Sequence, residues 1–166
     1  MRKISLLLFA ILLPLMASAQ MKFGYFSYEE AFKAMPEYAL AQANLNDLRS
    51  KYDAETKRVE EEFNRKYEEF LDGQSDFAPT ILQKRQTELQ ELLKKNVAFK
   101  AESAKLLKKA ETDSFAPLRE KLAKVVEKIG VERGLAFILN TDGDACPYIN
   151  PEMGEDLSQL IKEALR

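Results

Sequence analysis

The chain has 166 residues, with 25 lysines and arginines against 27 aspartates and glutamates, so its formal net charge is −2. It contains no histidine and one cysteine, which excludes most histidine-dependent catalysis, most zinc sites and any internal disulfide. The near-neutral charge gives no electrostatic case for a nucleic-acid partner. We therefore expect one folded unit that is not an enzyme, with no catalytic, cofactor-binding or metal-binding residue.

Residues 1–19 have the pattern of a secretory signal peptide. Arg2 and Lys3 precede an apolar run, Ile4–Leu15, and small residues at 17–19 predict cleavage after Ala19. The run of twelve residues is shorter than the about 20 that a membrane-spanning helix needs, so stable membrane insertion is not expected. The mature chain would keep 23 basic against 27 acidic residues, a net charge of −4.

The first part of the mature chain predicts a strand followed by a short helix. Phe23–Tyr28 is short and rich in aromatic residues, which favours a strand. Ser27 and Glu30 have the spacing of a capping box, so a helix should start there and run to about Met35. Pro36 then suits the first turn of the next helix.

Two long helices follow. The segment 37–71 has no Gly or Pro, and 72–76 reads as a turn. Pro79 can start a return helix that Pro117 should kink or interrupt. The apolar stripe is sparse for a coiled coil, so we expect a helical hairpin with marginal, bendable arms. On the first arm, the stripe consists of Leu45, Leu48, Tyr52, Val59, Phe63, Tyr67 and Phe70. On the return arm, it continues at Leu82, Leu89, Leu92 or Leu93, Phe99, Leu106 or Leu107, and Ala110.

The C-terminal part predicts two strands and a helix. Leu135–Leu139 reads as a strand, residues 140–144 as a hairpin turn, and 145–149 as the return strand. Asn150 and Pro151 should start a helix that reaches about Leu165. Three short strands leave open sheet edges, so we expect several copies to pool their strands. The predicted fold is α+β, mostly α, with a long antiparallel helical hairpin on a small β-body completed by oligomerisation.

One loop resembles the start of a calcium site. Asn140, Asp142 and Asp144 have the right spacing, but Ala145 and Pro151 stand where such a loop needs Gly and Glu. A turn is the favoured interpretation.

Two further groups of residues have alternative roles. Cys146 has no histidine partner and no second cysteine nearby, so a core position is favoured over a nucleophile. Apolar side chains on the first arm could contact a bound protein, but packing within the hairpin is the favoured role of Val59, Phe63, Tyr67 and Phe70.

The order of elements, with three short segments, resembles the Skp/OmpH family of periplasmic chaperones over essentially the whole mature chain. The segments are Met35-Pro36-Glu37-Tyr38, the stretch Ile129–Leu139, and Asp156-Leu157-Ser158. The resemblance implies a homotrimer, with a β-body built from 20–36 and 117–166. The β-body would contain strands at 23–28, 135–139 and 146–149, and each chain would add a tentacle over 37–116 with its tip near 72–78.

The same resemblance implies an ATP-independent periplasmic holdase without a cofactor. Its partners would be unfolded outer-membrane β-barrel protein precursors, bound in a cavity between the helical arms. The alternative is a structural periplasmic coiled-coil spacer or adaptor that binds one folded partner. A sparse hairpin seam favours the holdase, because a spacer needs a tight and continuous one.

Overall fold

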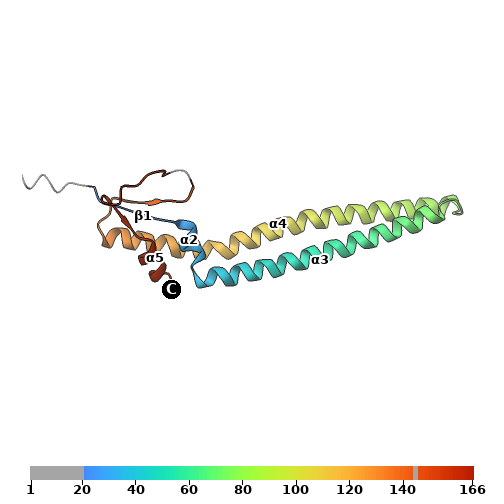
Figure 1. Ribbon diagram of the computed structural model, residues 1–166. Coiled ribbons are helices and arrows are strands. Elements are labelled where there is room, and N and C mark those ends of the chain that lie inside the picture. The colour runs from blue at the N-terminus through green and yellow to red at the C-terminus, as the bar shows by residue number, and fades with distance from the viewer. Residues whose placement is uncertain (1–20, 144–145) are drawn as a thin grey trace, which may run out of the picture. The chain divides into compact units, whose positions relative to one another are not determined.

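The computed structural model describes residues 21–143 and 146–166 (Figure 1). The predicted signal peptide lies outside the described residues, as do Asp144 and Ala145 of the predicted turn. The fold is α+β and mostly helical, as predicted. Its elements in chain order are β1 (Phe23–Phe26), α2 (Tyr28–Lys33), α3 (Pro36–Gly73), α4 (Pro79–Glu132), β2 (Phe137–Asn140), β3 (Gly154–Asp156) and α5 (Ser158–Ala164).

The described residues form two compact units. One comprises the segment up to Pro36 together with Leu118–Arg166, and is called the body here. The other, Glu37–Pro117, is the hairpin. Helix α4 contributes residues to both units.

Local chemistry sets where the first three helices begin, as the sequence predicts. Ser27 is the N-cap of α2, and its hydroxyl accepts a hydrogen bond of 3.1 Å from the backbone N–H of Glu30. Pro36 and Pro79 are the first residues of α3 and α4, where a missing N–H leaves no helical hydrogen bond unmade.

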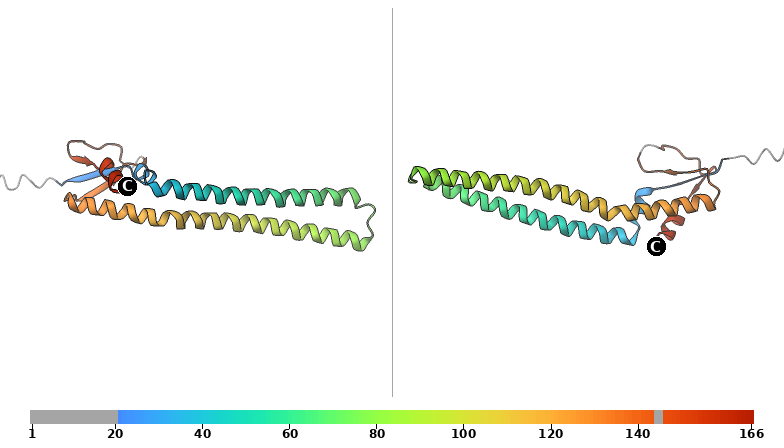
Figure 2. Two further views of the ribbon diagram at one scale, coloured as in Figure 1. Left: turned by 90° about the horizontal axis from the view of Figure 1, so that it is seen from below. Right: turned by 180° about the vertical axis from the view of Figure 1, so that it is seen from behind.

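The two long helices lie side by side through the hairpin, in both views of Figure 2. Aromatic pairs join them at intervals. The rings of Tyr38 and Phe115 stack at 5.3 Å between centroids, and those of Tyr52 and Phe99 lie 6.3 Å apart. Few side chains of the hairpin are buried, and those that are lie away from its tip: Leu45, Ser103 and Phe115. The seam is therefore thin, as the apolar stripe predicts.

Pro117 does not interrupt α4, which corrects one of the two outcomes expected for it. A proline in a helix removes the hydrogen bond to the carbonyl four residues earlier, here that of Asp113. Both Pro117 and Asp113 are exposed. Water can therefore solvate the released carbonyl, and the helix continues to Glu132.

The body contains a three-stranded parallel sheet in the order β2-β1-β3. Phe23 lies opposite Phe137 on one side and Gly154 on the other. The predicted return strand at Cys146–Ile149 is wrong, since β3 is Gly154–Asp156 instead. Pro147 removes a donor from the predicted strand. Gly154 can pair with Phe23 in the sheet because glycine has no side chain. A Cβ at this position would come within 2.5 Å of the Phe23 ring.

The predicted start of the last helix is also wrong. Asn150 opens a turn, in which its backbone carbonyl accepts hydrogen bonds from the N–H groups of Met153 and Gly154, both at 3.1 Å. That turn leads directly into β3. Helix α5 begins only at Ser158, whose N–H donates to the carboxylate of Asp156 at 2.9 Å.

The residues predicted as a hairpin turn hold the start of α2. Asp142 accepts hydrogen bonds from the Ser27 hydroxyl at 2.6 Å and from the Glu29 N–H at 2.7 Å. The Asn140 side chain accepts from the Tyr28 N–H at 3.1 Å. The hydrogen bond from Ser27 lowers the pKa of Asp142 below its usual value. The carboxylate thus caps a helix rather than starting an antiparallel hairpin.

A single chain already buries a core in the body. Gly24 and Phe26 of β1 are buried, and a Cβ on Gly24 would collide with the side chain of Leu157. Such close packing of strand on helix requires glycine at this position. The largest fully buried side chains are Met35, Leu122, Leu157, Ile161 and Leu165.

Candidate binding surface

The hairpin exposes apolar side chains along its length, although most of its surface is charged. Tyr67 is 45% exposed, Leu93 is 50% exposed and Val97 is 63% exposed. Exposed apolar side chains that cluster mark surfaces for binding rather than for folding. The exposed large apolar side chains of the hairpin are Leu40, Tyr67, Leu71, Ile81, Leu93, Val97 and Leu106. Leu106 lies on a different face of α4 from Leu93 and Val97 and does not cluster with them.

Two of these side chains line a groove between the helices. The groove has a volume of about 280 Å³ and an apolar lining of Val59 and Phe63 from α3 and of Leu93 and Val97 from α4. Its other lining residues are Thr56, Glu60, Asn64, Asn96 and Lys100. We call this feature the arm groove.

Helical spacing brings the apolar residues of the arm groove together. Val59, Phe63 and Tyr67 are four residues apart on α3, so they follow one another along one face. The rings of Phe63 and Tyr67 stack at 6.0 Å. Leu93 and Val97 have the same spacing on α4. Tyr67 therefore extends the apolar face of the groove toward the tip.

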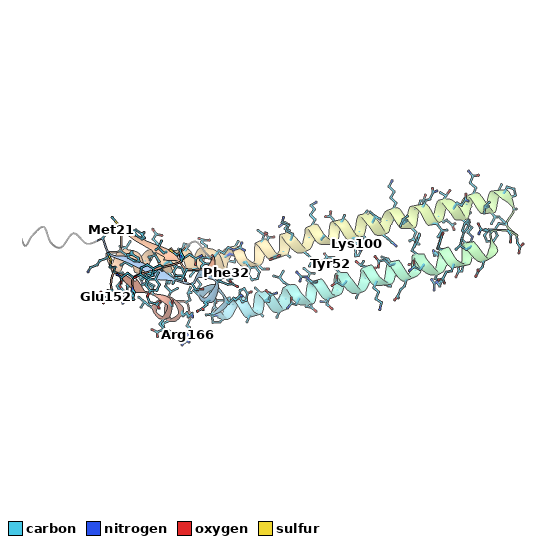
Figure 3. All side chains as sticks on the ribbon, turned by 45° about the horizontal axis from the view of Figure 1, so that its top comes forward. Met21, Phe32, Tyr52, Lys100, Glu152 and Arg166 are labelled. Atoms are coloured by element: carbon cyan, nitrogen blue, oxygen red, sulfur yellow. The ribbon has the colours of Figure 1, made fainter. Side chains whose placement is uncertain are left out.

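Polar contacts between the helices hold the groove walls in register. The Asn96 side chain donates a hydrogen bond of 2.9 Å to the backbone carbonyl of Val59. Lys100 and Glu60 form an ion pair at 3.6 Å. Figure 3 shows Lys100 on α4 and Tyr52 on α3 at about the same level of the hairpin.

Many charged side chains of the arms form ion pairs within their own helix. Arg58 binds Glu55 at 2.7 Å and Glu62 at 3.4 Å, and the hydrogen bond from Arg58 lowers the pKa of Glu55. Such exposed pairs add little stability but keep the surface solvated. The apolar groove thus lies in a balanced, charged surround.

The four apolar residues of the first arm, Val59, Phe63, Tyr67 and Phe70, differ in how far they are buried in the structure. Phe70 packs toward Phe77 near the tip, with ring centroids 6.4 Å apart. Val59 and Phe63 lie at the edge of the seam, half-buried, and Tyr67 is exposed. Packing within the hairpin therefore does not account for all of them.

Val97 is the groove residue that the apolar stripe does not include. Leu93 falls within the stripe only as an alternative to Leu92, and the structure leaves Leu93 exposed and Leu92 half-buried. The sequence signal that could have identified Val97 is its four-residue spacing from Leu93. Both residues lie beside the seam rather than on it.

The body has a second exposed apolar group. Phe137 of strand β2 is 44% exposed and stacks on Phe23 at 5.5 Å. Strands β2 and β3 each have one edge without a strand partner among the described residues. The other exposed apolar side chains of the body are Met21, Val131, Tyr148 and Met153.

Within 21–143 and 146–166, no group of three or more Cys, Asp or Glu side chains could hold a metal ion. None of the helices in those ranges is both long and apolar enough to cross a bilayer. Cys146 is a half-buried free thiol.

The structure is thus that of a mostly helical α+β protein, with a long helical hairpin that carries an apolar groove and a small body that contains a three-stranded sheet. The chain belongs to the OmpH-like family, whose description is outer membrane protein (OmpH-like) and whose match covers residues 22–165. No curated protein matches the sequence.

A similar solved structure is that of a Caulobacter crescentus protein described as an OmpH-like outer membrane chaperone. The TM-score is 0.69 at 16% sequence identity, and the match covers 86% of this chain and 82% of that one. At this identity the likeness shows the fold.

Proposed function

We propose that this protein is an ATP-independent periplasmic holdase that binds unfolded outer-membrane β-barrel precursors and keeps them soluble. Membership of the OmpH-like family supports the proposal. The pattern of a signal peptide at 1–19 supports export to the periplasm. The observation that carries the proposal is the exposed apolar groove on a thinly packed helical hairpin.

A holdase must bind many apolar sequences and release them without nucleotide. Scattered apolar side chains in a charged surround give weak contacts that do not depend on one client sequence. Several arms around one client multiply those contacts by raising the effective concentration. Release then requires only a competing site that buries the client better, so no catalytic group is needed.

We also propose that the protein works as a homotrimer. The open edges of β2 and β3 and the exposed Phe137 support association through the body. The number of copies comes from the family resemblance. Sedimentation of the mature protein should show a trimer, and Phe137→Lys should shift it toward smaller species. Monomer alone at micromolar concentration would contradict association.

The test of holdase activity is suppression of aggregation. A urea-unfolded β-barrel membrane protein is diluted into buffer with or without the mature protein, in the absence of nucleotide. We expect the protein to reduce light scattering, because clients are held before they aggregate. Unchanged scattering with excess protein would refute the proposal and favour the spacer alternative.

Matched variants locate the activity on the hairpin. Replacing both Leu93 and Val97 with Gln should weaken protection, whereas Leu106→Gln should preserve it. Leu106 is nine residues from Val97 and therefore about half a turn around α4, on the face away from the arm groove.

A further inference from the structure

We infer that the arm groove selects extended client segments in which apolar and polar residues alternate. The inference rests on the proposed function, because it names the part of an unfolded client that the arms recognise. It follows from the spacing, the volume and the charge of the groove.

The spacing of apolar side chains along α3 matches that of an extended chain. Val59, Phe63 and Tyr67 are four residues apart, so they recur about every 6 Å and span about 12 Å. In a strand, every second side chain points to the same side, and three of them span about 13 Å. A strand along α3 therefore brings three successive side chains of one strand face against the groove residues Val59 and Phe63 and the adjacent Tyr67, with a mismatch of about 1 Å.

The second wall of the groove has the same period. Leu93 and Val97 lie about 6 Å apart along α4. An inward client side chain is thus contacted from both helices. The groove has a volume of about 280 Å³ and is open to water. Apolar client side chains would displace this water from an apolar surface, which favours binding.

The charge of the groove favours an uncharged segment. Glu60 and Lys100 are paired with each other across the groove at 3.6 Å. The side chains of Thr56 and Asn64 are polar but neutral. They complement hydroxyl and amide groups, whereas a charged client residue finds no unpaired opposite charge among these lining residues.

These features together discriminate between sequence patterns. An alternating segment turns every apolar side chain inward and leaves its polar side chains in water. The same residues arranged in consecutive pairs would turn only half of their apolar side chains inward. Strands of outer-membrane barrels have the alternating pattern, and their lipid-facing positions carry few charges.

The test compares two twelve-residue peptides of identical composition, six valines and six threonines, in strict alternation or in consecutive pairs. Each carries the same fluorophore, and binding to the full mature protein is measured by anisotropy where both peptides are monomeric. We expect the alternating peptide to bind about tenfold more tightly, since it buries at least one more valine. Equal affinities, or no binding of either peptide, would overturn the inference.

Variants assign the selectivity to the groove. Val97→Gln should weaken binding of the alternating peptide about fivefold by removing one apolar contact, and Leu106→Gln should leave it unchanged. Both positions are exposed, so neither change should disturb the fold, which circular dichroism checks. Equal weakening by the two variants would overturn the assignment to the groove. The proposed holdase function is judged separately, by the scattering of a whole unfolded client.

Discussion

Ser103 is a weak point built into the seam of the hairpin. It is only 5% exposed, and its hydroxyl oxygen is fully buried without a hydrogen-bond partner among the described residues. A buried polar group without a partner costs about 1–3 kcal/mol of folding free energy. Alanine also has a higher helix propensity than serine, by about 0.5 kcal/mol. Together, the two effects should make Ser103→Ala raise the free energy of unfolding by about 1.5–3.5 kcal/mol.

The matched control is Ser50→Ala. Ser50 is an exposed residue within α3, so its replacement changes helix propensity without relieving a buried hydroxyl. We expect Ser50→Ala to add only about 0.5 kcal/mol. The difference between the two variants isolates the contribution of the buried hydroxyl.

Urea unfolding followed by circular dichroism measures both variants. For a slope of about 2 kcal/mol per molar, Ser103→Ala should raise the urea concentration at the midpoint by about 0.8–1.8 M. Hydrogen exchange around residue 103 should slow in the same variant, because the seam opens less often. If Ser103→Ala is no more stabilising than Ser50→Ala, the hydroxyl has a partner and the reasoning fails.

Three further predictions concern the body and the groove rim. Gly154→Ala should destabilise the body by about 1–3 kcal/mol in urea unfolding, because a Cβ there meets the Phe23 ring. Asp142→Asn should cost about 1 kcal/mol at pH 7, since the carboxylate caps α2. Lys100→Met should change the free energy of unfolding by less than about 0.5 kcal/mol, because the ion pair with Glu60 is exposed.

The Asp142 effect has a defined pH dependence. The pKa of Asp142 is lowered in the folded protein from a reference value of 3.8. Its charge therefore stabilises the fold above that value, and this stability is lost as the pH falls through the lower folded pKa. Unfolding curves of wild type and Asp142→Asn should converge in this acidic range. A gap that stays constant there would show that the carboxylate charge is not involved.

The predictions for Gly154→Ala and Lys100→Met can each be contradicted by the same unfolding measurements. Wild-type stability of Gly154→Ala would mean that Phe23 moves aside without cost. A loss of more than about 1 kcal/mol in Lys100→Met would mean that the stem of Lys100, or its charge, supports the hairpin more than an exposed pair does.

Local sequence signals were sufficient for the starts of the first three helices, the short α2 and the long α3 and α4. The Ser27 hydroxyl and the prolines at 36 and 79 act on the backbone within one turn, so their effect does not depend on the rest of the fold. The sparse stripe on α3 likewise predicted a thin seam. The sequence did not distinguish Leu93 from Leu92, since one residue separates a seam position from an exposed one.

The amino-acid sequence by itself determined the α+β class, the helical hairpin and the strand at β1, because capping, proline geometry and apolar periodicity act over short distances. Only the tertiary structure decided that β3 is Gly154–Asp156 and that all three strands are parallel. Those choices depend on contacts between distant residues, such as Gly154 with Phe23 and Asp142 with Ser27. The arm groove also depends on tertiary contacts, since it exists only where residues 56–64 of α3 and 93–100 of α4 lie side by side.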